Sequence, residues 1–277
     1  MRRVILCLLI AGSAAFADLA AGDKAFSKGD YYNALREYIP LAKQGNTEAA
    51  FRAGFIYCQG RTPDFAEALR WFQVAAKAGH PNAEFNLGQM YGFGQGVPKN
   101  PTESVRWYRV SAQHGWADAQ LRLGIAYEEG FGVAKDEKEA ARLYRLAATN
   151  PHPGQGRALA EFSLAVLYHE GRGVDKDLKE AAKWFEAAAE RGYPEAQFNI
   201  GWMYYVPEGV EENFVKAYAW IKLSGRSAAR SETVLKLPED SVAGKSKQIS
   251  DELAKKMTPE QLAAADRIIK TWKPKTN

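Results

Sequence analysis

The chain has 277 residues, of which 46% are hydrophobic and 25% are charged. These proportions are ordinary for a globular protein of one or two domains, and they exclude a low-complexity or fibrous chain. The net charge of only +4 argues against nucleic acid as the main partner, since binding to phosphates needs a larger basic surplus.

The N-terminal residues 1–17 have the layout of a secretory signal peptide. Arg2 and Arg3 precede an apolar run that is too short to cross a membrane as a helix. Small residues then precede Asp18, so we predict cleavage after Ala17. Cleavage would leave 260 of the 277 residues and would lower the net charge from +4 to +2, because both arginines are lost. We expect a periplasmic or secreted protein without stable membrane insertion; a buried N-terminal helix is the alternative.

The two cysteines limit the chemistry further. Cys7 lies inside the apolar run and Asp18 follows the cleavage site, so we do not expect a lipid anchor, which needs a cysteine directly after that site. Cys58 would be the only cysteine of the mature chain, so no internal disulfide can form even in an oxidising compartment. We interpret it as a buried, unreactive thiol.

Residues 18–46 predict a degenerate opening helix pair, with one helix from about Leu19 to Lys28 and a second from about Tyr31 to Lys43. Gly29-Asp30 forms the break, because glycine is favoured just after a helix and aspartate at the start of the next one.

Five repeat units of about 36 residues follow, at about 47–80, 81–116, 117–152, 153–192 and 193–224. One marker is a tyrosine that follows a small residue by three positions: Tyr57, Tyr91, Tyr127, Tyr168 and Tyr204. A second is a Trp or Leu in the second half of each unit: Trp71, Trp107, Leu143, Trp184 and Trp220. A third is an Asp or Asn: Asp64, Asn100, Asp136, Asp177 and Asn213. Such a period predicts a solenoid of stacked helix pairs.

The first helix of each unit carries a small residue within its apolar stripe, as at Gly88 and Gly124. Glycine lowers helix propensity by up to about 1 kcal/mol, so we expect a close approach of the neighbouring helix to compensate. A Gly-x-Gly-Val turn follows in three units, at 94–97, 130–133 and 171–174. We interpret it as a tight turn that needs positive φ, with the valine packed inward. A phosphate-binding loop is the alternative, but a preceding strand and the Lys-Ser/Thr of a P-loop are missing.

The second helices begin with a predicted capping box, in which the first residue caps the helix and an acid three residues later reaches back. The pairs are Asp64 with Glu67, Asn100 with Glu103, Asp136 with Glu139, and Asp177 with Glu180. In the fifth unit Asn213 is followed by Lys216, so only half of the cap is expected. Because these acids follow the helix starts, we interpret them as caps rather than as acid–base pairs for hydrolysis.

We interpret the tryptophan of each unit as a core residue wedged between the unit's two helices. An exposed row for stacking on carbohydrate is the alternative. The units three and four are separated by an insertion near 150–156 with two prolines and two glycines, which predicts a loop and a possible bend or hinge. The four histidines have no second ligand at metal spacing, so we predict neither a metal nor a cofactor: His80, His114, His152 and His169.

The period stops after Ser224, and residues 225–277 form a polar segment followed by capping helices. The helical content of 227–247 stays open, a short helix is expected over 250–256, and Thr258 should cap a final helix that Gln261 completes with a capping box. A solenoid must cover its last apolar face, and four residues of that helix fit this role: Leu262, Ile268, Ile269 and Trp272.

The combined pattern A-x-x-x-L-G-x-x-Y, G-x-G-V, a capping acid and W-F/Y-x-x-A-A-x-x-G, over residues 46–224, resembles the Sel-like (Sel-one type) repeat family, relatives of tetratricopeptide repeats. The resemblance implies an all-α, right-handed superhelical solenoid of antiparallel helix pairs that binds partners and has no active site. Exported bacterial members resemble adaptors or regulators of envelope assemblies. A cysteine-rich subset ties each helix pair with a disulfide, and a single mature cysteine excludes this chain from it.

Five candidate ligand-binding residues share one register on the first helices, just before the Leu of Leu-Gly or its equivalent: Arg52, Asn86, Arg122, Ser163 and Asn199. By resemblance to tetratricopeptide grooves, Asn86 and Asn199 match the asparagine that hydrogen-bonds a peptide backbone. Arg52 and Arg122 could each hold a carboxylate. An ordinary solvated polar face is the alternative for each of them.

The leading hypothesis is a non-catalytic scaffold or adaptor of the cell envelope, possibly regulatory, that binds a peptide or protein on its concave face. A cell-wall-directed enzyme or a β-lactam- or peptidoglycan-binding protein is the alternative, although no Ser/His/Asp or Cys/His set can be placed. A purely structural or oligomerising element is a third hypothesis. The sequence names neither the partner nor the oligomeric state.

Overall fold

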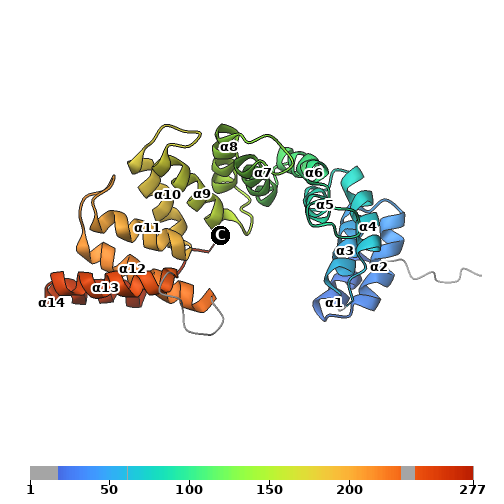
Figure 1. The fold of residues 1–277 in the computed structure, drawn as a ribbon. Coiled ribbons are helices and arrows are strands. Elements are labelled where there is room, and N and C mark those ends of the chain that lie inside the picture. Colours follow the sequence, from blue (N-terminus) through green and yellow to red (C-terminus); the bar gives the residue numbers. More distant parts are fainter. Residues whose placement is uncertain (1–17, 61, 232–240, 277) are drawn as a thin grey trace, which may run out of the picture.

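The computed structural model describes residues 18–60, 62–231 and 241–276, so the predicted signal peptide, residues 1–17, lies outside the described residues. The described residues form fourteen helices and no strand. They build an all-α, right-handed superhelical solenoid of antiparallel helix pairs. Figure 1 shows the solenoid as an arch, with the first helix of each unit toward the inside and α14 at the far end.

The helices follow the predicted pairing. The opening pair is α1 (Leu19–Ser27) and α2 (Tyr31–Lys43). The five units contribute α3 (Thr47–Gln59) with α4 (Phe65–Lys77), α5 (Pro81–Phe93) with α6 (Pro101–Gln113), α7 (Ala117–Glu129) with α8 (Glu137–Thr149), α9 (Arg157–Glu170) with α10 (Leu178–Glu190), and α11 (Pro194–Tyr205) with α12 (Phe214–Ser231). The chain continues with α13 (Val242–Lys256) and α14 (Pro259–Thr271).

The C-terminal part is more helical than the sequence pattern indicated. The last repeat helix α12 continues to Ser231, and α13 already begins at Val242. Thr258 and Gln261 form the predicted capping box of α14. Leu262 and Ile269 pack against the C-terminal core as expected, and the Trp272 ring lies edge-on to Trp220. The prediction for Ile268 is wrong, since this side chain is 41% exposed on the outer side of the helix.

The close approach expected at the mid-helix glycines is present. The aromatic residue directly after the Trp or Leu marker of the second helix provides it. A Cβ built on Gly88 would lie 2.5 Å from the ring of Tyr108, and one on Gly124 would lie 2.7 Å from Tyr144. The same contact recurs between Gly54 and Phe72. The rings are buried, so the missing side chain lets the two helices of a unit pack tightly.

The tryptophans take the predicted core position in the first unit but not in every unit. Trp71 is buried, but Trp107 and Trp184 are only half-buried, and Trp184 contacts the cores of two neighbouring units. At both half-buried rings the preceding basic residue lies over the tryptophan: the Arg106 guanidinium is 4.4 Å from the centroid of Trp107, and the Lys183 ammonium is 5.5 Å from that of Trp184. These are cation–π contacts at the surface, not a core wedge.

The predicted capping boxes are half confirmed: the Asp or Asn caps its helix, but the acid three residues later does not bond back to it. Each predicted Asp or Asn accepts a hydrogen bond from the backbone N–H three residues on, as in Asp64 from Glu67 and Asn213 from Lys216. The N3 acids do not reach back. They pair with the basic residue one turn further on: Glu67 with Arg70, Glu103 with Arg106, Glu139 with Arg142, and Glu180 with Lys183. An ion pair at this spacing competes with the cap, and here it also places the cation over the tryptophan.

The Gly-x-Gly-Val turns have the predicted positive φ, with values of 75° at Gly94 and 72° at Gly96. The second glycine also explains how successive units stack. A Cβ on Gly96 would lie 2.5 Å from the carbonyl oxygen of Phe65, at the start of the previous unit's second helix. Only glycine lets the turn rest on that helix start. Val133 and Val174 pack against the neighbouring clusters as expected.

A buried polar pair, not seen in the sequence, links the start of a unit's first helix to the end of its second. Glu84 lies 2.8 Å from His114, Gln120 accepts from Asn150 at 3.1 Å, and Arg191 donates to Glu161 at 3.0 Å. The acid or amide on the first helix is almost fully buried in each pair: Glu84, Gln120 and Glu161. Their common signal is an acid or amide directly after an alanine near the start of α5, α7 and α9: Ala83, Ala119 and Ala160.

The insertion at 150–156 is the predicted loop, and contacts hold it at both ends. The Asn150 amide also donates to the Gly115 carbonyl at 2.9 Å. The carboxylate of Asp118, on α7, accepts from the backbone N–H of Gly156 at 2.9 Å, so it caps the start of α9 from the preceding unit. A bend or hinge at this point stays a prediction.

Candidate functional site

The five candidate residues share the helices that line the inner side of the arch. They lie on α3, α5, α7, α9 and α11, the helices on the inner side in Figure 1. Their role in binding stays a prediction. Their surroundings show which of them already have partners and which are available to a ligand.

The two asparagines are already engaged within their own helices. The Asn86 amide nitrogen donates to the Asn82 carbonyl oxygen at 2.7 Å, and the Asn199 amide nitrogen donates to the Glu195 carbonyl oxygen at 2.7 Å. The Asn86 amide nitrogen also donates to the Asn82 side-chain oxygen at 3.0 Å, so the carbonyl oxygen is the group that Asn86 has available, whereas Asn199 keeps this oxygen and a second amide N–H. An oxygen alone accepts one backbone N–H of a bound peptide but cannot provide the two-sided contact that a free amide would give.

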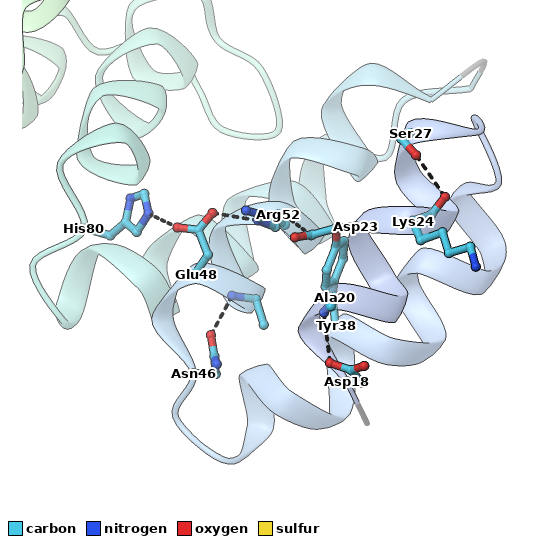
Figure 2. A network of polar contacts seen from close by, with 11 residues as sticks. Asp18, Ala20, Asp23, Lys24, Ser27, Tyr38, Asn46, Glu48, Arg52 and His80 are labelled. Atoms are coloured by element: carbon cyan, nitrogen blue, oxygen red, sulfur yellow. Dashed lines mark hydrogen bonds and ion pairs between the residues drawn. The ribbon is translucent and has the colours of Figure 1, made fainter. Parts of the chain in front are cut away.

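Arg52 is held by acids of two units. It makes ion pairs with Glu48, one turn earlier at 2.6 Å, and with Asp23 on α1, as Figure 2 shows. Asp23 in turn accepts from the Tyr38 hydroxyl at 2.6 Å, and Glu48 lies 3.1 Å from the His80 ring. The network neutralises the guanidinium, so Arg52 is a structural link between units and a weak candidate for carboxylate binding.

Ser163 is also structural. It is half-buried beside Tyr144, whose pKa is raised above its usual value by burial and by the hydrogen bond to Glu128. The Tyr144 hydroxyl donates to the Glu128 carboxylate at 2.6 Å. Little of Ser163 is left for a ligand.

Arg122 differs from the other four because its side chain is exposed and makes no hydrogen bond or ion pair with the described part of the chain. It lines a cleft of about 190 Å³ between units two and three, here called the central cleft. Its walls are the α5 end, α6 and α7, and the lining residues are Gly92, Phe93, Ser104, Tyr108, Arg122, Ile125, Ala126, Glu129 and Phe131. Phe93 is 68% exposed, a large apolar area left open to solvent.

A second concave cleft, here called the N-terminal cleft, lies between α1, α3 and α5 and has a volume of about 410 Å³. Three phenylalanine rings line it, Phe26, Phe51 and Phe55, and the Phe26 and Phe55 rings are 6.1 Å apart. Its polar rim consists of Glu48, Arg52 and Asn82, which already have partners. The cleft therefore fits an apolar side chain rather than a charged one.

The aromatic and aliphatic lining was missed by the sequence prediction, although a signal was present. The residue three positions after each candidate residue is apolar in four of the five units: Phe55, Gln89, Ile125, Val166 and Trp202. This spacing places it on the same face of the first helix as the candidate residue. The concave surface is thus an interrupted apolar row between polar positions, which suits a protein ligand.

Two kinds of reactive group, a thiolate and a cluster of metal ligands, can be checked among the described residues. Burial raises the pKa of the Cys58 thiol to about 11, so little thiolate is present at neutral pH. No group of three or more His, Cys, Asp or Glu in residues 18–60, 62–231 and 241–276 could hold a metal ion. Within these ranges no helix is both long and apolar enough to cross a membrane.

Comparison with protein families matches the chain to the Sel1 repeat at five places, residues 47–80, 81–116, 117–152, 158–193 and 194–227. Two solved structures share the fold. A protective antigen of uropathogenic Escherichia coli, described as displaying an SLR fold, has a TM-score of 0.74 at 30% identity and covers 92% of this chain and 52% of its own. A Sel1 repeat protein from Oxalobacter formigenes has a TM-score of 0.71 at 28% identity and covers 85% of this chain and 99% of its own.

Two curated proteins share shorter segments. The ERAD-associated E3 ubiquitin-protein ligase component HRD3 of Candida glabrata is 42% identical over 67 residues, which is 24% of this chain. An uncharacterized protein of Neisseria meningitidis serogroup B is 30% identical over 87 residues, or 31% of this chain. The matches span only 8% and 19% of the lengths of these relatives.

Proposed function

Because the chain belongs to the Sel1 repeat family, we propose that it is a non-catalytic adaptor of the bacterial cell envelope that binds a protein or peptide on its concave face. Sel1 repeats are generally protein-interaction scaffolds. The observation that carries the proposal is the concave surface itself, on which an apolar row and two clefts lie open along the first helices.

The two clefts support a peptide or loop as the ligand. The N-terminal cleft lies between α1, α3 and α5, and the central cleft lies between α5, α6 and α7, so both share α5. One extended segment of a partner could place successive side chains in both clefts. Stacked helix pairs elsewhere use the same kind of concave surface to bind peptides.

Location in the envelope rests on the sequence of residues 1–17, and the start of the fold is compatible with it. Asp18 caps α1 by accepting from the Ala20 N–H at 3.0 Å. Its own backbone nitrogen lies 3.0 Å from a carboxylate oxygen of Glu37. Cleavage after Ala17 would turn this nitrogen into an ammonium group next to a carboxylate, so the mature chain would keep the first contacts of its fold.

Site-specific photo-crosslinking in living cells tests the proposal. A photoreactive residue replaces Asn86, Ser163 or Asn199 on the concave side, and Gln73 or Lys183, exposed on second helices, serves as the matched control. We expect the concave positions to crosslink to the same one or few envelope proteins. Mass spectrometry of the purified chain should give an N-terminus at the predicted cleavage site.

Equal crosslinking from Gln73 and Lys183, or no crosslinked protein at any concave position, would contradict binding on the concave face. A chain that keeps residues 1–17 and remains in the cytoplasm would contradict the envelope location without affecting the binding surface.

A further inference from the structure

Two charges at the central cleft lack a partner. Arg122 and Glu129 both line this cleft and both are exposed. Neither makes a hydrogen bond or an ion pair with residues of the described ranges, in contrast to Arg52, which two acids neutralise. Since an unpaired charge on a concave surface costs nothing until a ligand covers it, these two groups are available to select a ligand by charge.

The distance between the two charges determines how far apart the opposite charges of a ligand must lie. Arg122 and Glu129 are seven residues apart on α7, so they lie about two helical turns apart on one side of the helix, roughly 10.5 Å along its axis. An extended chain advances about 3.3 Å per residue, so three residues cover the same distance. An acidic and a basic side chain three residues apart would therefore each reach an opposite charge.

The space between the two charges is apolar. Ile125 lies between them on α7, and the aromatic rings of Phe93 and Phe131 form the sides. Lys99 lies 5.7 Å from the centroid of the Phe131 ring, which fixes that side of the cleft. Tyr108 is 7% exposed and forms the base together with Ser104, so the cleft is shallow and fits one apolar side chain.

We propose that the central cleft binds an extended segment of a partner protein in which an acidic and a basic residue stand three positions apart with an apolar residue between them. The carboxylate pairs with Arg122, the cation pairs with Glu129, and the apolar side chain enters the cleft. This inference rests on the proposed function, because it specifies the ligand of the same concave surface.

The test selects peptides from a display library of random extended peptides with the full mature chain as bait. The wild-type chain should enrich peptides with one acidic and one basic residue three apart. The Arg122→Glu variant should enrich two basic residues at that spacing, and Glu129→Arg should enrich two acidic ones. A peptide selected by the wild type should lose about tenfold in affinity for either variant, since an attraction becomes a repulsion.

Lys179→Glu, a charge reversal on the exposed face of α10, is the matched control and should enrich the same peptides as the wild type. Thermal unfolding checks that the exposed substitutions leave the fold intact. Peptides that crosslink to Asn86 but whose charges do not follow the substitutions would overturn the inference and leave the proposed function standing. Enriched charges seven residues apart would indicate a helical ligand and would also overturn it. Absence of any peptide or protein at the concave positions would count against the proposed function itself.

Discussion

The contact between Gly88 and Tyr108 shows how one absent side chain sets the spacing of a helix pair. Glycine inside a helix normally costs up to about 1 kcal/mol relative to alanine. In this position the Tyr108 ring occupies the space that a methyl group would need. The loss of helix propensity is therefore offset by the burial of an aromatic ring against the backbone.

We predict that Gly88→Ala destabilises the protein although alanine is the better helix former. Overpacking in a tight core costs about 1–3 kcal/mol and the gain in propensity is at most about 1 kcal/mol, so a net loss of about 1–2 kcal/mol is expected. Urea denaturation of the wild type and the variant measures this difference. An unchanged or raised free energy of unfolding would show that the ring can move away without cost.

Unit four provides a control for this prediction, because Ala165 occupies the equivalent position and packs in the same cluster as Phe185. There the methyl group has its own space. Ala165→Gly should also destabilise, by about 1–2 kcal/mol, through lost burial and lower helix propensity. Opposite substitutions that both destabilise would show that each helix pair is spaced for its own residue.

The buried polar pairs show how the same helix-to-helix link is made with different charges. Unit three uses the neutral pair Gln120 and Asn150, and unit four uses the charged pair Glu161 and Arg191. Burial raises the pKa of the Glu161 carboxyl, and the nearby Arg191 and Arg157 only partly oppose this effect. The ion pair therefore holds the two helices together while its desolvation reduces the net gain.

We predict that Glu161→Ala costs about 3 kcal/mol, because it removes a buried carboxylate that two partly buried arginines, Arg157 and Arg191, contact. The double variant Glu161→Gln with Arg191→Asn recreates the pair of unit three and should change stability by less than about 1 kcal/mol. Chemical denaturation of both variants measures the two free energies. A double variant as unstable as the single one would mean that the charge, and not the polar link, is required.

The raised pKa also predicts the sign of a pH effect at this pair. A carboxyl with a folded-state pKa above its unfolded value contributes most stability below the unfolded value, about 4.3, and loses that contribution as pH rises through the folded-state pKa. The free energy of unfolding of the wild type, measured relative to Glu161→Gln, should therefore increase as pH falls from 7 toward about 4.5. A decrease over this interval would show that the two arginines outweigh burial.

Local patterns in the sequence predicted where the helices start and how they are capped, but they predicted the contacts between side chains and between helices less well. The caps at Asp64 and Asn213 follow from the residues next to them, so the helix starts were predicted within the repeats. The reach-back of Glu103 was wrong although Arg106, its actual partner, lies only three residues away. The wedge was assigned to Trp107 instead of Tyr108, because one position in a helix changes the direction by 100° and only the packing against the unit's first helix shows which ring lies between the two helices.

The sequence was sufficient to predict that the candidate residues share one position in the repeat. It was not sufficient to predict which of them are free to bind a ligand. Arg52 and Arg122 occupy the same repeat position, yet only Arg52 forms ion pairs among the described residues, because Asp23 comes from the opening helix pair and the acid one turn before Arg122, Asp118, accepts from Gly156 instead. The self-bonding of Asn86 depends on Asn82 one turn earlier. Differences between units, which a repeat pattern averages out, therefore determine which groove residues are free.

Across the whole molecule each unit contacts mainly its neighbours, so the last apolar face needs a cover. In this chain α14 provides it: Ala265 is buried, Leu262 and Ile269 pack on the C-terminal cluster, and the Lys275 side chain forms an ion pair with Glu190 at 2.5 Å. The chain end thereby returns to α10 on the inner side of the arch, as Figure 1 shows.

We predict that removal of residues 258–277 loosens the C-terminal end of the solenoid and leaves the N-terminal end folded. The truncation exposes the cluster around Leu253 and Met257, so amide hydrogen exchange should become faster in α11, α12 and α13 and stay nearly unchanged in α3 to α6, since stability in such arrays is transmitted between neighbours. Ile268→Ala is the matched control: it alters the exposed side of α14 and should change stability by less than about 0.5 kcal/mol. Faster exchange along the entire chain after truncation would mean that the array unfolds as one cooperative unit, and α14 would then be required for the concave surface as a whole.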